Sequence, residues 1–162
     1  MPIESVEQRL ASLGIVLPEA TNPAGNYTNF VEVNGLLFIA GKAPTALNGV
    51  KPVGRLGAEF TTQQGYEYAR QAGIEVLAVV KAALGSLDRV KRVVKIQGFI
   101  NADTHFTEHP KVLDGCSDLM VEVFGARGVH ARSVLGGSSL RDNLPIVVDS
   151  IFQVEQGTES NS

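Results

Sequence analysis

The last strand that the sequence predicts is apolar on both of its faces. Successive side chains of a strand point to opposite faces, so Ile146, Val148 and Phe152 share one face. Val147 and Ile151 lie on the other face. A strand that is apolar on both faces is usually buried on both faces. The chain must therefore fold so that both faces of this strand are covered.

Three further segments have the composition of strands. Residues 30–39 form a predicted hairpin, because Asn34 and Gly35 supply the two positive φ angles of a type I′ turn. β-branched and aromatic residues predict two more strands, over residues 90–100 and 129–135. The last predicted strand covers residues 146–154, and a polar loop joins it to the strand over residues 129–135.

Two long helices are predicted between the strands. Apolar or small residues recur at helical spacing after Thr61 or Thr62, either of which can cap the helix, and Gly85 is a natural stop. A second helix is expected from about Pro110 to Phe124, with a glycine directly after it. Each helix has one apolar stripe, so each is expected to pack one side against the sheet.

These elements predict a single α+β domain over residues 1–155. A short amphipathic helix over residues 3–13 extends its N-terminus, and residues 156–162 are expected to form a disordered tail. Two long helices on one face of a mixed sheet make a two-layer domain. The second face of the sheet then needs another cover. Self-association is the simplest solution, so we predict a homo-oligomer.

Composition excludes several classes of protein. Apolar residues make up 44% and charged residues 19% of the 162 residues, as in a globular domain. A net charge of −3 with scattered basic residues argues against nucleic acid as a partner. Cys116 is the single cysteine, so no intrachain disulfide can form. The N-terminal residues do not resemble a signal peptide, and no apolar run approaches the ~20 residues that span a bilayer. We expect a cytoplasmic protein without a membrane partner.

Two motifs could suggest a metal or a cofactor. His105 and His109 are four residues apart, but Pro110 disfavours helical geometry at His109, and no cysteine or acidic ligand has matching spacing. We therefore expect two exposed loop histidines and no metal site. The Gly-Gly-Ser-Ser segment at residues 136–139 lacks the lysine and the following helix of a phosphate-binding loop. It is expected to be a flexible hairpin loop, and no cofactor is predicted.

The sequence gives little support to nucleophilic catalysis. Cys116 falls on the inner face of a predicted helix, where a free cysteine usually acts as a small apolar residue. Ser133 is not framed by the glycines of a nucleophile elbow. No Ser-His-Asp arrangement can be argued from residue spacing.

Arg132 is the strongest candidate for a functional residue. It lies in a short predicted strand among apolar and small neighbours. Arginine is rarely buried unless it is paired, and its planar guanidinium suits bidentate binding of a carboxylate. From the residue pattern alone, an outward-facing side chain or a structural ion pair is favoured over a ligand-binding role.

A set of ordered landmarks over residues 22–155 resembles the RidA/YjgF family, historically also described as L-PSP endoribonucleases. The alanine-arginine-serine segment is the most specific landmark, because it follows the second helix at the expected distance. The landmarks are, in chain order, Gly25-Asn26-Tyr27, Leu37 to Lys42, Gly85 followed by Ser86 to Val90, Phe124-Gly125, Ala131-Arg132-Ser133 and Leu144-Pro145. The chain resembles a divergent subgroup of this family.

The resemblance implies a chorismate-mutase-like fold and a homotrimer with ligand clefts between the subunits. It implies that Arg132 binds the carboxylate of a small imine or enamine, which water hydrolyses to a 2-keto acid and ammonia. Such a reaction needs positioning and modest proton transfer. The resemblance implies four further ligand-binding positions, which are Tyr27, Gly41, Ser117 and Val134. Tyr27 is an aromatic cleft residue, and Gly41 and Val134 offer backbone groups. Ser117 replaces an asparagine.

Members of the family often carry a glutamate on the last strand that positions water or a proton. The matching position is Val147 or Asp149; the alignment favours Val147, whereas only Asp149 could perform that role. The absence of this glutamate motivates a second hypothesis, a non-catalytic trimer that binds small carboxylates or regulates a partner. A third hypothesis, endoribonuclease activity, is the weakest because the chain has no basic stripe.

Overall fold

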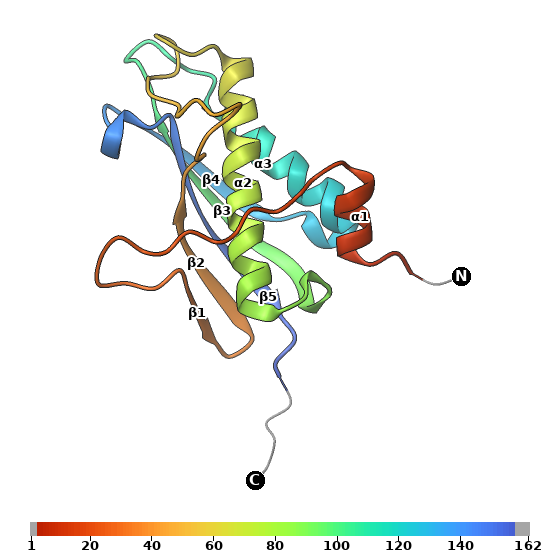
Figure 1. Cartoon of the computed structure of the whole chain (residues 1–162). Coiled ribbons are helices and arrows are strands. Elements are labelled where there is room, and N and C mark those ends of the chain that lie inside the picture. The colour runs from red at the N-terminus through yellow and green to blue at the C-terminus, as the bar shows by residue number, and fades with distance from the viewer. Residues whose placement is uncertain (1–2, 158–162) are drawn as a thin grey trace.

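The computed structural model describes residues 3–157, in which five strands form one mixed sheet (Figure 1). The order across the sheet is β1-β2-β5-β3-β4. The strands β3 and β4 are parallel, and every other neighbouring pair is antiparallel. The strands are β1 Phe30–Val33, β2 Leu36–Lys42, β3 Val90–Asn101, β4 Ala131–Gly137 and β5 Ile146–Val154.

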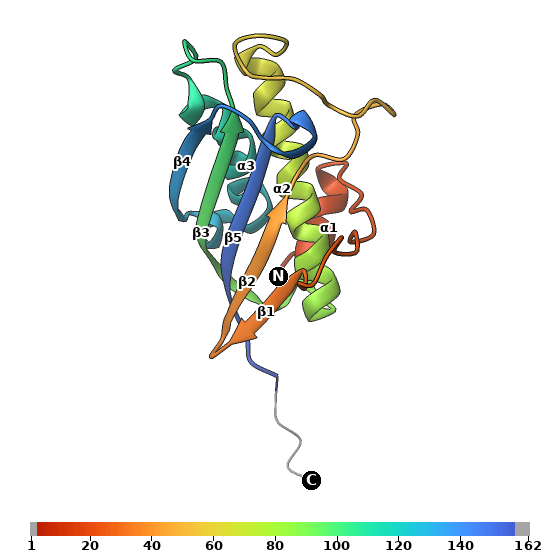
Figure 2. The ribbon, with the colours of Figure 1, turned by 90° about the vertical axis from the view of Figure 1, so that its left-hand side faces the viewer.

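Two long helices cover one face of this sheet (Figures 1 and 2). They are α2, Thr62–Leu84, and α3, His109–Phe124, and the short helix α1, Val6–Ser12, packs at the end of α3. Three 3-10 turns complete the elements, at Leu87–Arg89, Gly125–Gly128 and Arg141–Asn143. The predicted two-layer α+β class is confirmed.

Local sequence signals explain where several elements begin and end. Thr61 caps α2 and forms a capping box with Gln64. Gly85 ends the same helix in the left-handed conformation, with φ 79°. In the β1–β2 hairpin, Asn34 and Gly35 have φ angles of 50° and 76°, as a type I′ turn requires.

The hydrophobic core lies between the sheet and the two long helices. Leu37, Ile96 and Phe152 point from the sheet into this layer and are almost fully buried. The helices α2 and α3 approach closely, because Gly115 of α3 faces the backbone of α2 at Tyr66. This contact has no room for a larger residue, so the helix pair is closely fitted where it crosses.

The prediction of a hairpin loop after β4 is wrong. The strands β4 and β5 are not neighbours, because β4 pairs with β3 and β5 lies between β2 and β3. Residues 138–145 therefore cross over the end of β3, with a 3-10 turn at Arg141–Asn143 on the way. The crossover that a parallel pair requires is the segment with α3 between β3 and β4, whereas residues 138–145 join two strands that run in opposite directions on either side of β3.

The second face of the sheet is not covered by any helix among residues 3–157, and Figure 2 looks directly onto it. Leu135 and Phe38 are 47% and 43% exposed there. The apolar residues of this face include Phe38, Phe99, Leu135, Val147 and Ile151. A contiguous apolar patch on a single chain indicates an interaction surface, so the prediction of a homo-oligomer keeps its physical basis.

Replacing Ile151 by aspartate should shift the protein toward monomers. The substitution puts a charge in the middle of the uncovered face, where burial against a second copy would cost several kcal/mol. Sedimentation velocity at micromolar concentration measures the change, and Val16→Asp, at an exposed loop position outside the sheet, is the matched control. A wild-type protein that sediments as a monomer would contradict the prediction.

Candidate functional site

Arg132 points from β4 toward the helices. It is paired with the buried Ile96 across the β3–β4 ladder, so both side chains lie on the helix side of the sheet. Its Nη1 donates to Asp114 Oδ1 at 2.8 Å and to Ser117 Oγ at 3.1 Å, and its Nη2 donates to the Pro110 carbonyl at 3.3 Å. The structure therefore shows an ion pair with α3, and Arg132 is not an outward-facing strand arginine.

The guanidinium keeps free donors in spite of these contacts. Arginine has five N–H groups, and the three hydrogen bonds described use three of them. The side chain of Arg132 remains 26% exposed. Two N–H groups are thus left for a ligand, and a planar carboxylate is the group that they fit best.

A serine–histidine pair lies beside Arg132. Ser117 Oγ is 2.9 Å from His130 Nε2, and His130 Nδ1 is 2.6 Å from the Gly128 carbonyl oxygen. A carbonyl oxygen can only accept, so Nδ1 carries the proton and Nε2 accepts from the Ser117 hydroxyl. The same hydroxyl oxygen accepts from Arg132. The result is a directed chain of donors from Arg132 through Ser117 to His130.

The surroundings of His130 favour its neutral form. Its pKa is lowered, mainly because burial disfavours the charged ring and further because Arg132 is close; the Gly128 carbonyl opposes this shift. A neutral imidazole whose Nε2 faces a hydroxyl can accept a proton through it. The cluster therefore combines a cationic anchor with a candidate general base.

The pairing of Ser117 with His130 was missed by sequence reasoning, which found no serine–histidine arrangement. The two residues are 13 positions apart, on different elements, so no local spacing joins them. One signal was available: His130 precedes Arg132 by two residues, and residues two apart along a strand lie on the same face. Both side chains could then have been expected to point toward the second helix.

The lowered pKa of His130 should make the stability of the fold depend on pH. The unfolded chain then takes up a proton near the ordinary value of 6.5 while the folded chain does not. The stability that neutral His130 contributes is therefore fully present above pH 6.5 and is lost as the pH falls through this value. We expect the free energy of unfolding to drop between about pH 7.5 and about pH 5.5, and to drop less in His130→Gln. Urea unfolding at both pH values measures this, and equal drops in both proteins would contradict the assignment.

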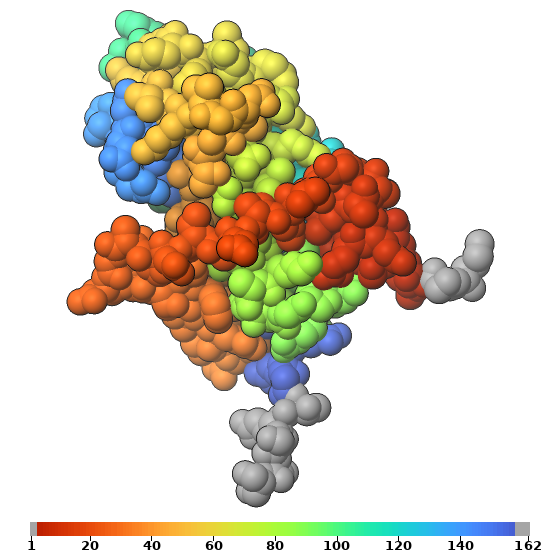
Figure 3. Space-filling model, in the orientation of Figure 1, coloured from red at the N-terminus to blue at the C-terminus, as the bar shows by residue number. Residues whose placement is uncertain are grey.

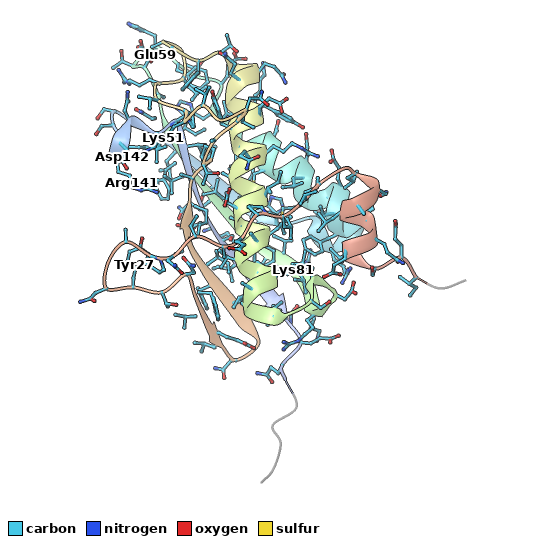
Figure 4. The ribbon with its side chains drawn as sticks, viewed as in Figure 1. Tyr27, Lys51, Glu59, Lys81, Arg141 and Asp142 are labelled. Carbon is cyan, nitrogen blue, oxygen red and sulfur yellow. The ribbon has the colours of Figure 1, made fainter. Side chains whose placement is uncertain are left out.

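A second polar region lies at the other side of the molecule, in a cleft of about 480 Å³. Figure 3 shows the surface hollowed between the orange segment near residue 27 and the blue segment near residue 142. Figure 4 shows Tyr27 on one side of this hollow and Lys51, Arg141 and Asp142 on the other. Gly41, Lys42, Thr45 and Glu75 also line it.

Two of the predicted ligand-binding residues belong to this cleft. Tyr27 is 60% exposed and is not packed into the hairpin. Gly41 faces the uncovered side of the sheet, where a Cβ would come within 2.8 Å of Val147. The glycine is therefore needed for the close approach of β2 and β5 at this point.

The two remaining predicted residues lie elsewhere. Val134 is half-buried on β4 and packs against the core from the helix side. Asp149 lies on the uncovered face, and its pKa is raised because burial disfavours the carboxylate, an effect that Lys95 opposes. Asp149 is thus two strands away from Arg132 and on the opposite face of the sheet.

The structure brings Arg132 and Ser117 together but separates them from Tyr27, Gly41 and Asp149. The strands β2 and β4 lie on opposite sides of the β5–β3 pair. Neighbouring strands are about 4.8 Å apart, so a small ligand cannot reach from Arg132 to the cleft within one chain. A site that uses both regions requires a second copy of the chain.

The expectation of two exposed loop histidines is wrong for one of them. His105 is exposed, but His109 begins α3, is half-buried, and packs edge-on against Phe106 at a centroid distance of 5.1 Å. Pro110 is compatible with helical geometry here because it occupies the first turn, where its missing N–H is not needed. The position of Cys116 was predicted correctly: it is buried, and burial raises the pKa of its thiol to about 12.

The arrangement of five strands and two covering helices defines the chorismate-mutase-like class of α+β proteins. Residues 7–151 match the family described as "YjgF/chorismate mutase-like, putative endoribonuclease". The chain belongs to this family, and the resemblance to RidA/YjgF proteins seen in the sequence is confirmed.

Individual relatives agree with this assignment. Protein TCP17 of Trypanosoma cruzi is 40% identical over 150 residues, which cover 92% of this chain and 94% of that protein. The crystal structure of a putative endoribonuclease from Shewanella oneidensis is 34% identical, with a TM-score of 0.88 over 93% of this chain and 99% of the other. Protein Atu1372 from Agrobacterium tumefaciens, of unknown function, is 32% identical, with a TM-score of 0.84 over 94% and 93% of the two chains.

Among residues 3–157, no helix has the length and apolar content needed to cross a membrane. The cytoplasmic location and the single domain over residues 1–155 stay predictions. The predicted disordered tail falls largely on residues 158–162, which lie outside the described residues.

Proposed function

We propose that the protein binds small imines or enamines that carry a carboxylate, and hydrolyses them to a 2-keto acid and ammonia. The observation that supports this most is the guanidinium of Arg132, which is oriented by Asp114 and Ser117 and retains two free N–H groups. A fixed guanidinium at a partly exposed position can hold a carboxylate in one orientation. The resemblance to RidA/YjgF proteins implies the same activity, whereas the description of the matched family names only a putative endoribonuclease.

The Ser117–His130 pair can supply the proton transfers. Water attacks the carbon of the C=N bond and gives up a proton to Ser117 Oγ as the hydroxyl proton passes to His130 Nε2. The protonated imidazole returns this proton through Ser117 Oγ to the nitrogen, which gives a carbinolamine. The hydroxyl proton of the carbinolamine then passes to the amino nitrogen by the same relay, so the C–N bond breaks as the C=O bond forms and ammonia leaves. No electron acceptor is needed, because the net change is addition of water and loss of ammonia. General acid–base help of this kind contributes about 100-fold or more.

This assignment accounts for the missing glutamate of the last strand. Val147 is apolar and half-buried against Gly41, so it offers no proton acceptor. Asp149 could take part only at an interface, because it lies on the uncovered face. We propose that a homotrimer completes the site. Tyr27 and Gly41 of a second copy then lie over Arg132 of the first copy, and the Val134 backbone lies beside the ligand.

Ammonia release tests the proposal directly. The purified protein is added to 2-aminoacrylate, generated enzymatically, and ammonia is followed against the spontaneous rate. We expect a clear acceleration that increases with protein concentration and that falls in His130→Gln. Spontaneous rates at all protein concentrations would contradict hydrolysis.

A second candidate is a non-catalytic module that binds small carboxylates. It is favoured by the ion pair of Arg132 with Asp114, which already neutralises much of the guanidinium charge. In that case 2-keto acids and related carboxylates bind at Arg132 while imines are not hydrolysed. Endoribonuclease activity, the name carried by some relatives, has less support because the net charge of the chain is −3.

A further inference from the structure

Two buried groups of opposite charge line the cleft of about 480 Å³ without touching each other. Lys42, at the end of β2, is 8% exposed, and Glu75, in the middle of α2, is 3% exposed. Within the described part of the chain, no N–O contact of 4.0 Å or less joins them. Both residues line the cleft, so one small ligand within it could contact each of them.

Each of the two groups has unused hydrogen-bonding capacity. Lys42 Nζ donates to Asn29 Oδ1 at 2.6 Å, and an ammonium has two further N–H groups. On Glu75, Oε1 accepts from the Thr45 hydroxyl at 2.8 Å, and Gln71 lies at 3.5 Å from the same oxygen. The second carboxylate oxygen of Glu75 has no protein donor among the described residues.

Leaving such charges apart in a low-polarity environment is costly. A buried charge needs a partner or strong hydrogen bonds to offset the loss of water. The pKa of Lys42 is lowered, mainly by burial and also by Arg141, while Glu75 opposes the shift. A ligand that carried both charges would satisfy both residues at once, which neither a simple anion nor a simple cation could do.

The rim of the cleft adds positive charge. Lys51 and Arg141 lie together on one side of the opening (Figure 4). Arg141 is paired with Asp142 at 3.2 Å, but both side chains are more than half exposed, so this pair is weak. Lys51 is exposed and forms no ion pair among the described residues. A second acidic group on the ligand would find its partners here.

We propose that this cleft binds small zwitterions, with the ammonium of the ligand on Glu75 and its carboxylate on Lys42. The rim favours ligands with a further acidic group, so an acidic α-amino acid is the class that fits best. The cleft shares Tyr27 and Gly41 with the proposed trimeric site, but the inference does not rest on imine hydrolysis, because Lys42 and Glu75 take no part in that reaction. Lys42 and Glu75 are also distinct from the arginine and the last-strand glutamate that the family resemblance assigns to the ligand.

Isothermal titration calorimetry with L-glutamate tests the proposal, with glutarate as the matched ligand that lacks the ammonium. We expect L-glutamate to bind with a Kd of about 1 mM or below and glutarate to bind at least about tenfold more weakly. Glu75→Gln and Lys42→Met should each weaken L-glutamate binding about tenfold or more. Glu59→Gln and Lys81→Met change exposed residues that do not line the cleft, and should leave binding unchanged (Figure 4).

Three results would overturn the proposal. The first is wild-type protein that does not bind L-glutamate at millimolar concentration. The second is equal binding of glutarate and L-glutamate by the wild-type protein. This comparison uses no variant, so it remains valid even if a substitution prevents folding. The third is unchanged binding in a folded Glu75→Gln variant, with folding checked by circular dichroism.

Discussion

Replacing Arg132 by alanine should lower kcat/KM for imine hydrolysis by about 100-fold or more. The substitution removes the group that would hold the substrate carboxylate. It also removes the donor to Ser117 Oγ, so the hydroxyl that faces His130 loses its orientation. Initial rates of ammonia release from enzymatically generated 2-aminoacrylate measure the effect.

The chain offers a closely matched control for this substitution. Arg70 pairs with Glu122 at 2.9 Å with 24% of its side chain exposed, whereas Arg132 pairs with Asp114 at 2.8 Å with 26% exposed. Arg70→Ala thus removes a comparable ion pair between a helix and its neighbour, and should leave ammonia release within about twofold of wild type. Arg132→Lys keeps the charge but loses the planar fork, so we expect an intermediate rate. Unchanged hydrolysis in Arg132→Ala would refute the role assigned to this residue.

Replacing Gly115 by alanine should destabilise the fold by about 3 kcal/mol or more. An added Cβ would overlap the Tyr66 carbonyl oxygen, and would lie 2.8 Å from the carbonyl carbon and 3.1 Å from the Arg70 nitrogen. All three are backbone atoms of α2, so no side-chain rotation can relieve the overlap. The two helices would have to move apart, and the core between them and the sheet would lose contacts.

Urea unfolding followed by circular dichroism, at one fixed protein concentration, measures this loss. Gly25→Ala is the control, because its Cβ would meet only the exposed Tyr27 ring at 3.5 Å and its φ is not in the left-handed region. We expect Gly25→Ala to change the free energy of unfolding by less than about 0.5 kcal/mol. A Gly115→Ala variant as stable as the control would show that the helix contact is looser than described.

Much of the fold could be predicted because its signals are local. The Asn34-Gly35 turn, the Thr61 cap and the Gly85 stop each depend on a few neighbouring residues, and the structure has all three where they were expected. The last strand was predicted with its observed ends, at Ile146 and Val154. The path after β4 could not be predicted in this way, because strand order depends on pairings between distant segments.

The candidate site was harder to predict for the same reason. Arg132 was selected from its strand context and the family resemblance, but its partners lie on a helix and could not be inferred from spacing. The cleft pair gave even less signal. Glu75 falls within the apolar stripe of α2, directly before Val76, and Lys42 ends an apolar strand. In both positions a charged residue in an apolar pattern was the one available clue.

The central place of β5 has a consequence for how the chain folds during its synthesis. The sheet order places β5 between β2 and β3, although β5 is the last strand to be made. Until residue 154 has left the ribosome, β2 and β3 each expose an unpaired edge, and edges of this kind recruit other strands. The hairpin and the two long helices can form early from local contacts, whereas closure of the sheet must wait for the final pairing. Nascent chains that stop before β5 are therefore the species most exposed to aggregation, and the pairing of β5 with β2 and β3 is the step that protects them.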